Sequence, residues 1–257
     1  MYGPNQELTT ISSESGDVLV FVAQSANQPP DFWAAEIDAG RFSPRQLTHI
    51  NPQLERYSFG KSMLIEWHSL GGDLLRGAVL LPSEYHPGQR YPMVVWVYGG
   101  SELSNKLNVF GGFQIEFGAI DNMQLLTTRG YAVLFPDAPL RTAPMRDLAY
   151  AVLPGINKTV ELGIADPDRL GLLGESFGGY STLALITQTS RFRAALMRSG
   201  WGDNMAAYNA MSDNGSSFML GVLESGQGRM GGTPWEYRDR YIENSPIFYL
   251  NEVQLHC

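Results

Sequence analysis

Residues 169–186, RLGLLGESFGGYSTLALI, run an apolar strand directly into a glycine-bounded turn and then into an apolar helix. Within them, residues 174–178 (GESFG) fit the pattern G-x-S-x-G, whose central serine occupies a sharp, strained strand-to-helix turn. The two glycines let strand and helix approach closely, and the turn lifts the serine hydroxyl clear of the sheet. The pattern therefore predicts that Ser176 is a catalytic nucleophile. The alternative is a glycine-rich turn with an incidental serine.

Two groups are predicted to stabilise the negative charge that develops on a substrate oxygen beside Ser176. The helix that begins near Phe177 has unpaired N–H groups at the positive end of its dipole, so the Phe177 N–H is placed to donate to an oxyanion. A second donor is expected after an earlier strand, and residues 94–102 (VVWVYGGSE) end such a strand. Tyr98 in this segment can donate from its neutral phenol. The alternative is a core aromatic residue that caps the strand.

Buried strands and helices alternate from about residue 60 onward, which predicts the α/β class with a mostly parallel sheet covered by helices. Two segments flank a hairpin turn, LGGD, and four apolar runs read as strands buried on both faces. Pro154 is expected to break or kink the second helix. The predicted strands are 62–69, 74–82, 91–100, 130–139, 169–175 and 192–200, and the predicted helices are 118–129, 145–162, 177–189 and 234–243.

The first 50 residues have a different pattern. Residues 17–24 and 31–38 are short strand candidates separated by the turn-rich SANQPP, and residues 45–51 are a third candidate. The apolar face of so small a sheet requires a partner. At the other end, residues 253–257 (VQLHC) resemble the opening of a further buried strand.

The composition excludes several partner classes. The formal net charge is −8 and no run of Lys or Arg stands out, so we expect no nucleic-acid partner and no anionic membrane partner. Cys257 is the single cysteine, which rules out an intrachain disulfide and a Cys-based metal site. No apolar stretch approaches 18 residues and the first residues carry no signal peptide, which predicts a soluble chain and weakly favours the cytoplasm. No cofactor or metal is implied.

The general base is difficult to assign. A serine nucleophile needs an imidazole to take its proton and an acid to orient that imidazole, in the chain order Ser, Asp or Glu, then His. Only His256 follows Ser176, and a residue of the last predicted strand is the simpler reading of it. His49, His68 and His86 all precede the serine.

With these residues in view, the chain resembles the prolyl oligopeptidase family of serine peptidases, in its dipeptidyl-peptidase and acylaminoacyl-peptidase branches. The resemblance is carried by residues 165–180 (ADPDRLGLLGESFGGY), 91–100 (YPMVVWVYGG) and 234–254 (PWEYRDRYIENSPIFYLNEVQ). It implies an α/β-hydrolase fold, with Tyr98 at the position that donates to the oxyanion. It also implies that Trp201 and Tyr208 line the pocket for the residue before the scissile bond, although ordinary aromatic packing would explain both equally well.

The resemblance also implies a domain organisation. Residues 1–55 would be the remnant of the last blade of a β-propeller, and residues 56–257 a peptidase domain that is incomplete at its C-terminus. The family's Asp and His have no matching position here, so we expect the isolated fragment to be inactive. The acidic pair that binds a peptide amino terminus in the dipeptidyl branch has no match either, so exopeptidase specificity is not supported.

Three functions follow from these observations. The first is a serine peptidase that hydrolyses peptide bonds in oligopeptides through an acyl-enzyme on Ser176, with a peptide as its substrate. The second is a carboxylesterase with the same turn, since sequence does not separate ester from amide chemistry. The third is a non-catalytic fragment or binding remnant.

Overall fold

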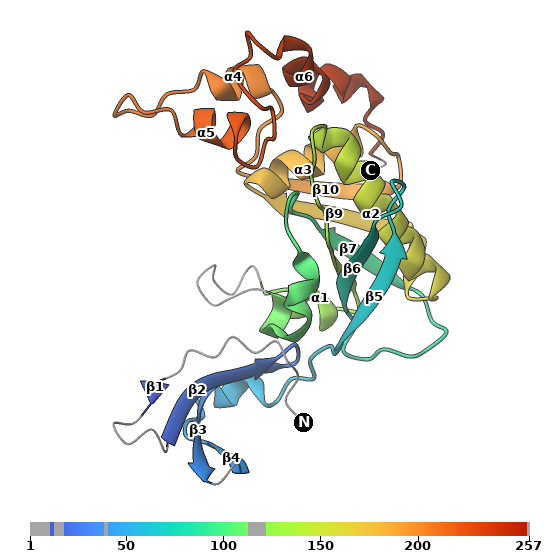
Figure 1. Ribbon diagram of the computed structural model, residues 1–257. Helices are drawn as coiled ribbons and strands as arrows, with labels where there is room; N and C mark the ends of the chain where they lie inside the picture. Colours follow the sequence, from blue (N-terminus) through green and yellow to red (C-terminus); the bar gives the residue numbers. More distant parts are fainter. Residues whose placement is uncertain (1–10, 13–17, 39–40, 113–121, 256–257) are drawn as a thin grey trace. The chain divides into compact units, whose positions relative to one another are not determined.

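The computed structural model describes residues 11–12, 18–38, 41–112 and 122–255 (Figure 1). The chain divides into two compact units. The first comprises residues 1–63, 80–85 and 105–131, and the second comprises residues 64–79, 86–104 and 132–257. The second unit contains the turn that carries Ser176.

The first unit contains an antiparallel sheet in the order β1-β2-β3-β4. Its strands are β1 (Ile11–Ser12), β2 (Val18–Ser25), β3 (Gln28–Asp38) and β4 (Arg41–Gln46). Phe21 and Ala23 of β2 are buried against Ala35 of β3, as the alternating pattern predicts. The predicted strands at 17–24 and 31–38 are thus confirmed, but the third was placed too late: β4 ends at Gln46 instead of continuing to residue 51.

A carboxylate explains why the chain leaves the sheet after β4. Asp31 is 8% exposed as a residue. Its carboxylate accepts hydrogen bonds from the Thr48 hydroxyl, from Gln46 Nε2 at 2.8 Å and from the N–H groups of Phe32 at 2.9 Å and Ile50 at 3.3 Å. The chain after Gln46 therefore wraps around Asp31. Burial alone would raise the pKa of this carboxyl, but the four hydrogen bonds outweigh burial and hold the pKa below its ordinary value of 3.8.

Acid should weaken this unit through Asp31. Because the carboxyl's pKa is lower in the folded chain than in the unfolded chain, its contribution to the free energy of unfolding is present above pH 3.8. That contribution is lost as the pH falls through the lowered pKa. We expect Asp31→Asn to reduce the stability of the unit at pH 7 and to matter progressively less below pH 3.8. Amide hydrogen exchange of β2 and β3 measures this, and a stability difference that grew in acid would contradict it.

The second unit contains most of a six-stranded sheet in the order β10-β9-β7-β8-β6-β5. Its strands are β5 (Ser62–His68), β6 (Leu74–Leu80), β7 (Tyr91–Trp96), β8 (Ala132–Pro136), β9 (Ala165–Glu175) and β10 (Phe192–Arg198). The pairs β7–β8, β7–β9 and β9–β10 are parallel, so the carboxyl ends of these four strands meet at one edge. The centre of the sheet is fully apolar, with Val95 and Leu134 at 0% exposure. All six predicted strands overlap the observed ones, although β9 begins earlier than predicted, at Ala165, and β7 ends earlier than predicted, at Trp96.

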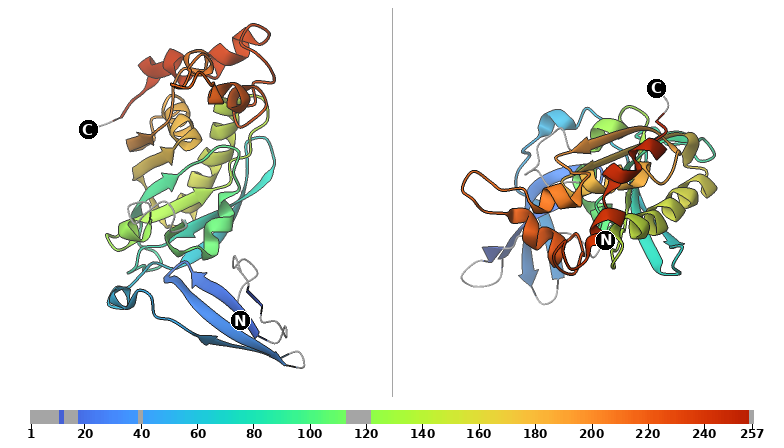
Figure 2. Two further views of the ribbon diagram at one scale, coloured as in Figure 1. Left: turned by 90° about the vertical axis from the view of Figure 1, so that its left-hand side faces the viewer. Right: turned by 90° about the horizontal axis from the view of Figure 1, so that it is seen from above.

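Helices α2 (Pro144–Glu161) and α3 (Phe177–Ile186) pack against each other and against the sheet (Figure 1, Figure 2). Pro154 does not break α2, contrary to one of the two outcomes predicted for it. A proline has no N–H, so the carbonyl of Tyr150, four residues earlier, has no helical donor. The N–H of Leu70, at the turn between β5 and β6, donates to that carbonyl at 3.0 Å instead. The tertiary contact thereby replaces the hydrogen bond that the proline removes.

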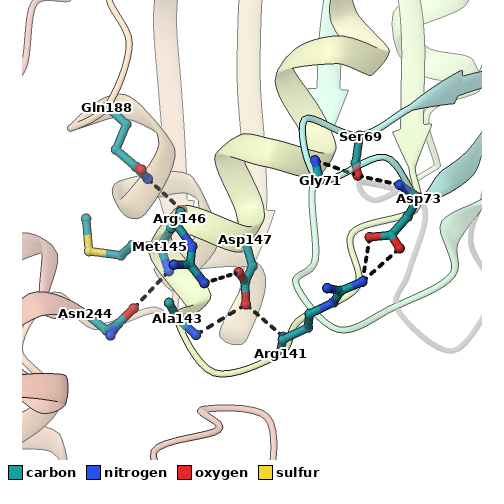
Figure 3. A network of polar contacts seen from close by, with 10 residues as sticks. All are labelled: Ser69, Gly71, Asp73, Arg141, Ala143, Met145, Arg146, Asp147, Gln188 and Asn244. Carbon is teal, nitrogen blue, oxygen red and sulfur yellow. Dashed lines mark hydrogen bonds and ion pairs between the residues drawn. The ribbon is translucent and has the colours of Figure 1, made fainter.

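A polar network holds the start of α2 (Figure 3). The buried carboxylate of Asp147 accepts the N–H of Arg141 at 2.8 Å and that of Ala143 at 3.3 Å. The Arg141 guanidinium reaches across to both carboxylate oxygens of Asp73, at 2.8 and 2.9 Å, on the β5–β6 turn. The loop after β8 is thus connected to the turn between two other strands.

The remaining helices are short. They are α1 (Gln124–Thr127) in the first unit, and α4 (Asn204–Tyr208), α5 (Phe218–Glu224) and α6 (Arg238–Glu243) in the second. The predicted helices at 234–243 and 118–129 contain α6 and α1, and residues 118–121 of the latter lie outside the described residues. The sequence did not predict α4 or α5. Four 3₁₀ segments complete the described elements: Pro52–Leu54, Leu103–Asn108, Phe110–Gly112 and Pro246–Glu252. Among the helices that the structure describes, none has the length and apolar character needed to cross a membrane.

The predicted strand at residues 253–257 is not observed where the structure describes the chain. Residues 253–255 have no regular secondary structure, and His256 and Cys257 lie outside the described residues. Residues 253–255 directly follow the 3₁₀ segment Pro246–Glu252.

Candidate active site

Ser176 occupies a strained backbone conformation between β9 and α3. Its φ is 57° and its ψ is −120°, which is rare for a residue with a side chain. The Ser176 N–H donates to the carbonyl of Arg198, at the end of the neighbouring strand β10, at 2.8 Å. The Ser176 hydroxyl has no hydrogen-bond partner among the residues that the structure describes. This geometry agrees with the strand-turn-helix that the sequence predicts.

Glycines allow the close packing around this turn. A Cβ atom on Gly174 would overlap the carbonyl of Gly178, and one on Gly178 would lie 2.5 Å from the carbonyl oxygen of Val97. A Cβ on Gly179 would lie 2.6 Å from the Arg198 carbonyl oxygen. The first turn of α3 is therefore in direct contact with β9 and with the chain segments that follow β7 and β10.

The amide of Phe177 begins α3, and helix geometry leaves it without an intrahelical acceptor. The first helical hydrogen bond runs from the Tyr180 N–H to the Ser176 carbonyl at 3.1 Å. The Phe177 ring is 1% exposed, so its side chain anchors the start of the helix in the core. The N–H group and the positive end of the helix dipole are available beside Ser176.

Tyr98 follows β7, which pairs with β9 in the sheet. The Val97 N–H donates to the Leu173 carbonyl at 2.9 Å, which aligns the end of β7 with the end of β9. The Tyr98 ring lies 6.1 Å from the ring of Phe177, centroid to centroid, and is partly exposed. The structure therefore brings Tyr98 and Phe177 together beside Ser176. The hydroxyl of Tyr98 contacts the side-chain amide of Gln227.

A buried carboxylate that the sequence analysis did not single out supports the loop after Tyr98. Asp137, directly after β8, accepts the Ser104 N–H at 2.8 Å and the Ser104 hydroxyl at 3.1 Å. Gly100 and Ala138 connect the same two loops, since the Gly100 N–H donates to the Ala138 carbonyl at 2.7 Å. Burial raises the pKa of Asp137 despite these hydrogen bonds. The one feature of the sequence that could have indicated this role for Asp137 is its position at the carboxyl end of a buried strand.

Glu175, the residue before the serine, forms an ion pair with Arg198. Glu175 Oε2 lies 2.8 Å from Arg198 Nη2, with both side chains about one third exposed. Because the Arg198 carbonyl also accepts the Ser176 N–H, one residue of β10 contacts two consecutive residues of the turn. We infer that this pair helps to hold the strained backbone.

Trp201 and Tyr208 lie in different surroundings in the structure. The Trp201 ring packs on Phe177 at 5.7 Å and on Tyr180 at 5.5 Å, next to the turn, and its Nε1 donates to Asn204 at 2.8 Å. Tyr208 is only 6% exposed and belongs to an apolar cluster with Leu223, Met230 and Tyr241. Its hydroxyl donates to Glu224 at 2.6 Å, and this hydrogen bond raises the pKa of Tyr208 to about 12.

Two buried asparagines connect these aromatic residues to α2 and α3. The backbone carbonyl of Asn244 accepts the Tyr180 hydroxyl at 2.8 Å and Asn204 Nδ2 at 2.6 Å. Asn244 Oδ1 accepts the Met145 N–H at 3.1 Å, as Figure 3 shows. Asn204 and Asn244 are 1% and 3% exposed, so these hydrogen bonds must be made on folding. Their positions in the sequence gave no signal of this role.

The described histidines do not supply a base. In the second unit, neither His68 nor His86 forms a hydrogen bond with Ser176, and His49 belongs to the first unit. His256 lies outside the described residues. Asp203, one of the acids between Ser176 and His256, caps α4 by accepting the N–H groups of Met205 and Ala206. Over the described ranges, no group of three or more His, Cys, Asp or Glu side chains is arranged to hold a metal ion.

Comparison with known proteins agrees with this geometry. The model of the prolyl oligopeptidase family matches residues 147–257, which include the turn and the helices after β10. The chain is 24% identical over 224 residues to "Uncharacterized peptidase YuxL" of Bacillus subtilis, a match that covers 82% of this chain and 31% of YuxL. It is 30% identical over 182 residues to human dipeptidyl peptidase 8, covering 65% of this chain and 18% of that protein.

The fold also matches a solved structure. The acylaminoacyl peptidase of Pyrococcus horikoshii superposes with a TM-score of 0.70 at 21% sequence identity, over 96% of this chain and 38% of that one. At this identity the likeness establishes the fold, which is the α/β-hydrolase fold that the family resemblance implies. The chain thus spans less than two fifths of the relatives that it matches. Over residues 147–257 the chain is thus similar to the prolyl oligopeptidase family, and its relatives in sequence include proteins named as peptidases.

Proposed function

We propose that the whole protein is a serine peptidase that cleaves peptide bonds through an acyl-enzyme on Ser176. The observation that carries the proposal is the strained conformation of Ser176 beside the start of a helix, with a hydroxyl that has no partner in the described part of the chain. Backbone strain of this kind persists only where the surrounding structure imposes it, and it concentrates at active sites. Here glycines and the Arg198 carbonyl impose it.

In the proposed reaction the Ser176 Oγ attacks the scissile carbonyl carbon and forms a tetrahedral intermediate. The Phe177 N–H and the Tyr98 hydroxyl donate to its oxyanion, which is supported by their position on either side of the contact between α3 and the end of β7. A histidine must accept the serine proton and deliver it to the leaving amine. Collapse of the intermediate releases the amine, and water then hydrolyses the acyl-enzyme.

We further propose that Trp201 lines the pocket for the residue before the scissile bond, because its ring packs on Phe177. Tyr208 would form the inner wall of that pocket with one ring edge, since little of it is exposed. No cofactor or metal enters this scheme. For the domain organisation, we propose a propeller-blade remnant at residues 1–55 and a hydrolase domain at 56–257; the antiparallel sheet β1–β4 supports the first assignment.

A fluorophosphonate probe tests the nucleophile in the full-length protein. We expect one equivalent of probe to be incorporated, and peptide mapping to locate it on Ser176. Ser225→Ala, which removes an exposed hydroxyl elsewhere in the same unit, is the matched control and should label like wild type. Stable labelling of a different residue would overturn the assignment.

Turnover of two substrates then separates amide from ester chemistry. We expect the full-length protein to hydrolyse alanyl p-nitroanilide as well as p-nitrophenyl acetate. Cleavage of the ester alone would favour the carboxylesterase alternative, with the same nucleophile and the same oxyanion donors.

A further inference from the structure

The loop between α5 and α6 is tightly held by its own backbone. In residues 225–231, the N–H groups of Gly226, Gly228 and Met230 donate to carbonyls of α5 at 2.8, 2.8 and 2.9 Å. The Met230 side chain is fully buried in the cluster beneath α4 and α5. Gln227 is exposed in the middle of this loop, so its side chain projects from a rigid support.

The loop contains one strained residue and receives one further contact from α6. Arg229 has a φ of 56°, which is uncommon for a residue other than glycine and requires support from its surroundings. Arg240 of α6 provides part of that support, since its Nη1 donates to the Met230 carbonyl at 2.7 Å. The loop is thus held at both ends as well as through its buried methionine.

The side chain of Gln227 meets the hydroxyl of Tyr98. Gln227 Nε2 lies 3.1 Å from Tyr98 Oη, and Gln227 Oε1 lies 3.4 Å from it. The shorter of the two contacts is the one in which the amide donates to the phenol oxygen. A phenol that accepts a hydrogen bond still has its own proton to donate elsewhere.

We propose that Gln227 is a positioning residue that directs the Tyr98 proton toward the oxyanion at Ser176. By donating to Tyr98 Oη, the amide occupies a lone pair of the phenol and leaves the O–H free to point at the substrate oxygen. The inference rests on the proposed function, because it requires Tyr98 to be an oxyanion donor. Gln227 touches neither substrate nor nucleophile, and acts through Tyr98.

Substitutions that keep the size of Gln227 but change its hydrogen bonding test the proposal in the full-length protein, with alanyl p-nitroanilide as substrate. In Gln227→Glu, the carboxylate can only accept, so it takes the Tyr98 proton away from the oxyanion. We expect kcat to fall about 100-fold, the size expected for loss of one oxyanion donor, with KM unchanged. In Gln227→Met, only the orienting bond is lost, and we expect a fall of about 5-fold.

The same substitutions in a Tyr98→Phe background provide the control. Without the phenol hydroxyl, Gln227→Glu and Gln227→Met should have no further effect on kcat. Equal fold-changes in both backgrounds would overturn the role of Gln227 while leaving Ser176 as the nucleophile. Absence of probe labelling at Ser176 would instead remove the proposed function itself, so the two failures are distinguishable.

A spectroscopic readout tests the contact without turnover. With 3-fluorotyrosine at position 98, we expect the ¹⁹F resonance to move in Gln227→Met and in Gln227→Glu, and to stay in place in Ser225→Ala, which alters the same loop. If the ¹⁹F chemical shift were the same in both Gln227 variants as in the wild type, the amide would not hold the phenol and the proposal would be wrong.

Discussion

Ser176→Ala abolishes peptidase turnover in the full-length protein, by our expectation, with kcat falling on the order of 10⁶-fold. The variant keeps the proposed oxyanion donors and the proposed substrate pocket, so a residual rate of about 10³–10⁴ over the uncatalysed reaction should survive. The measurement is a progress curve with alanyl p-nitroanilide under conditions sensitive enough to detect this residual rate. Turnover within about 10-fold of wild type would contradict the proposed nucleophile, since oxyanion stabilisation and binding alone do not supply such a rate.

The same position should show a trade between stability and activity. At a φ of 57° and a ψ of −120°, any side chain with a Cβ is strained, whereas glycine adopts such conformations readily. Strain of this kind costs about 1–3 kcal/mol. Ser176→Gly should therefore be more stable than Ser176→Ala by about 1 kcal/mol or more, while both lack the proposed nucleophile. Equal unfolding free energies in the two variants would mean that the turn relaxes and stores no strain.

Gly178→Ala is the second change with a large expected effect. Its new Cβ would lie 2.5 Å from the Val97 carbonyl oxygen and 3.2 Å from Cδ2 of Tyr98. Because the nearest atom belongs to the backbone of a buried segment, α3 or the end of β7 must move. We expect a loss of about 1–3 kcal/mol in the free energy of unfolding, the range for overpacking. We also expect kcat to fall, since the shift separates Tyr98 from Ser176.

Gly221→Ala is the matched control for this prediction. Gly221 also lies inside a helix, α5, but a Cβ there would meet nothing within 4 Å. With no clash, the better helix propensity of alanine should raise stability by about 0.5–1 kcal/mol. Denaturant unfolding measures both variants. A stabilised Gly178→Ala variant would mean that the contact between α3 and the end of β7 is looser than the structure shows.

Local patterns in the sequence predicted much of this structure correctly. The six strands of the large sheet appear where the apolar runs place them, and the glycines around Ser176 predict the strained turn. These features depend on residues close together in the chain, whose preferences act without help from distant segments. Pro154 shows the limit: its effect on α2 depends on a donor from the β5–β6 turn, more than 80 residues away in sequence.

The supporting residues of the candidate site could not be predicted in this way. Asp137 and Gln227 become relevant only because each meets a loop distant in sequence. The short helices α4 and α5 were also missed, since their stability comes from the buried cluster around Tyr208 more than from a long amphipathic pattern. Tyr208 itself was selected by resemblance, and only its burial shows that little of its ring can face a substrate.

The sequence by itself therefore determined the strained turn at Ser176, the resemblance to a peptidase family and the alternation of strands and helices, because each depends on residues that lie close together in the chain. Only the tertiary structure decided which groups surround Ser176. The reason is the strand order: β7 lies between β8 and β9, so the ends of three strands that are distant in the chain meet at one edge. Tyr98, Asp137 and Ser176 follow those three ends, and hydrogen bonds between their loops form only once the sheet has assembled in that order.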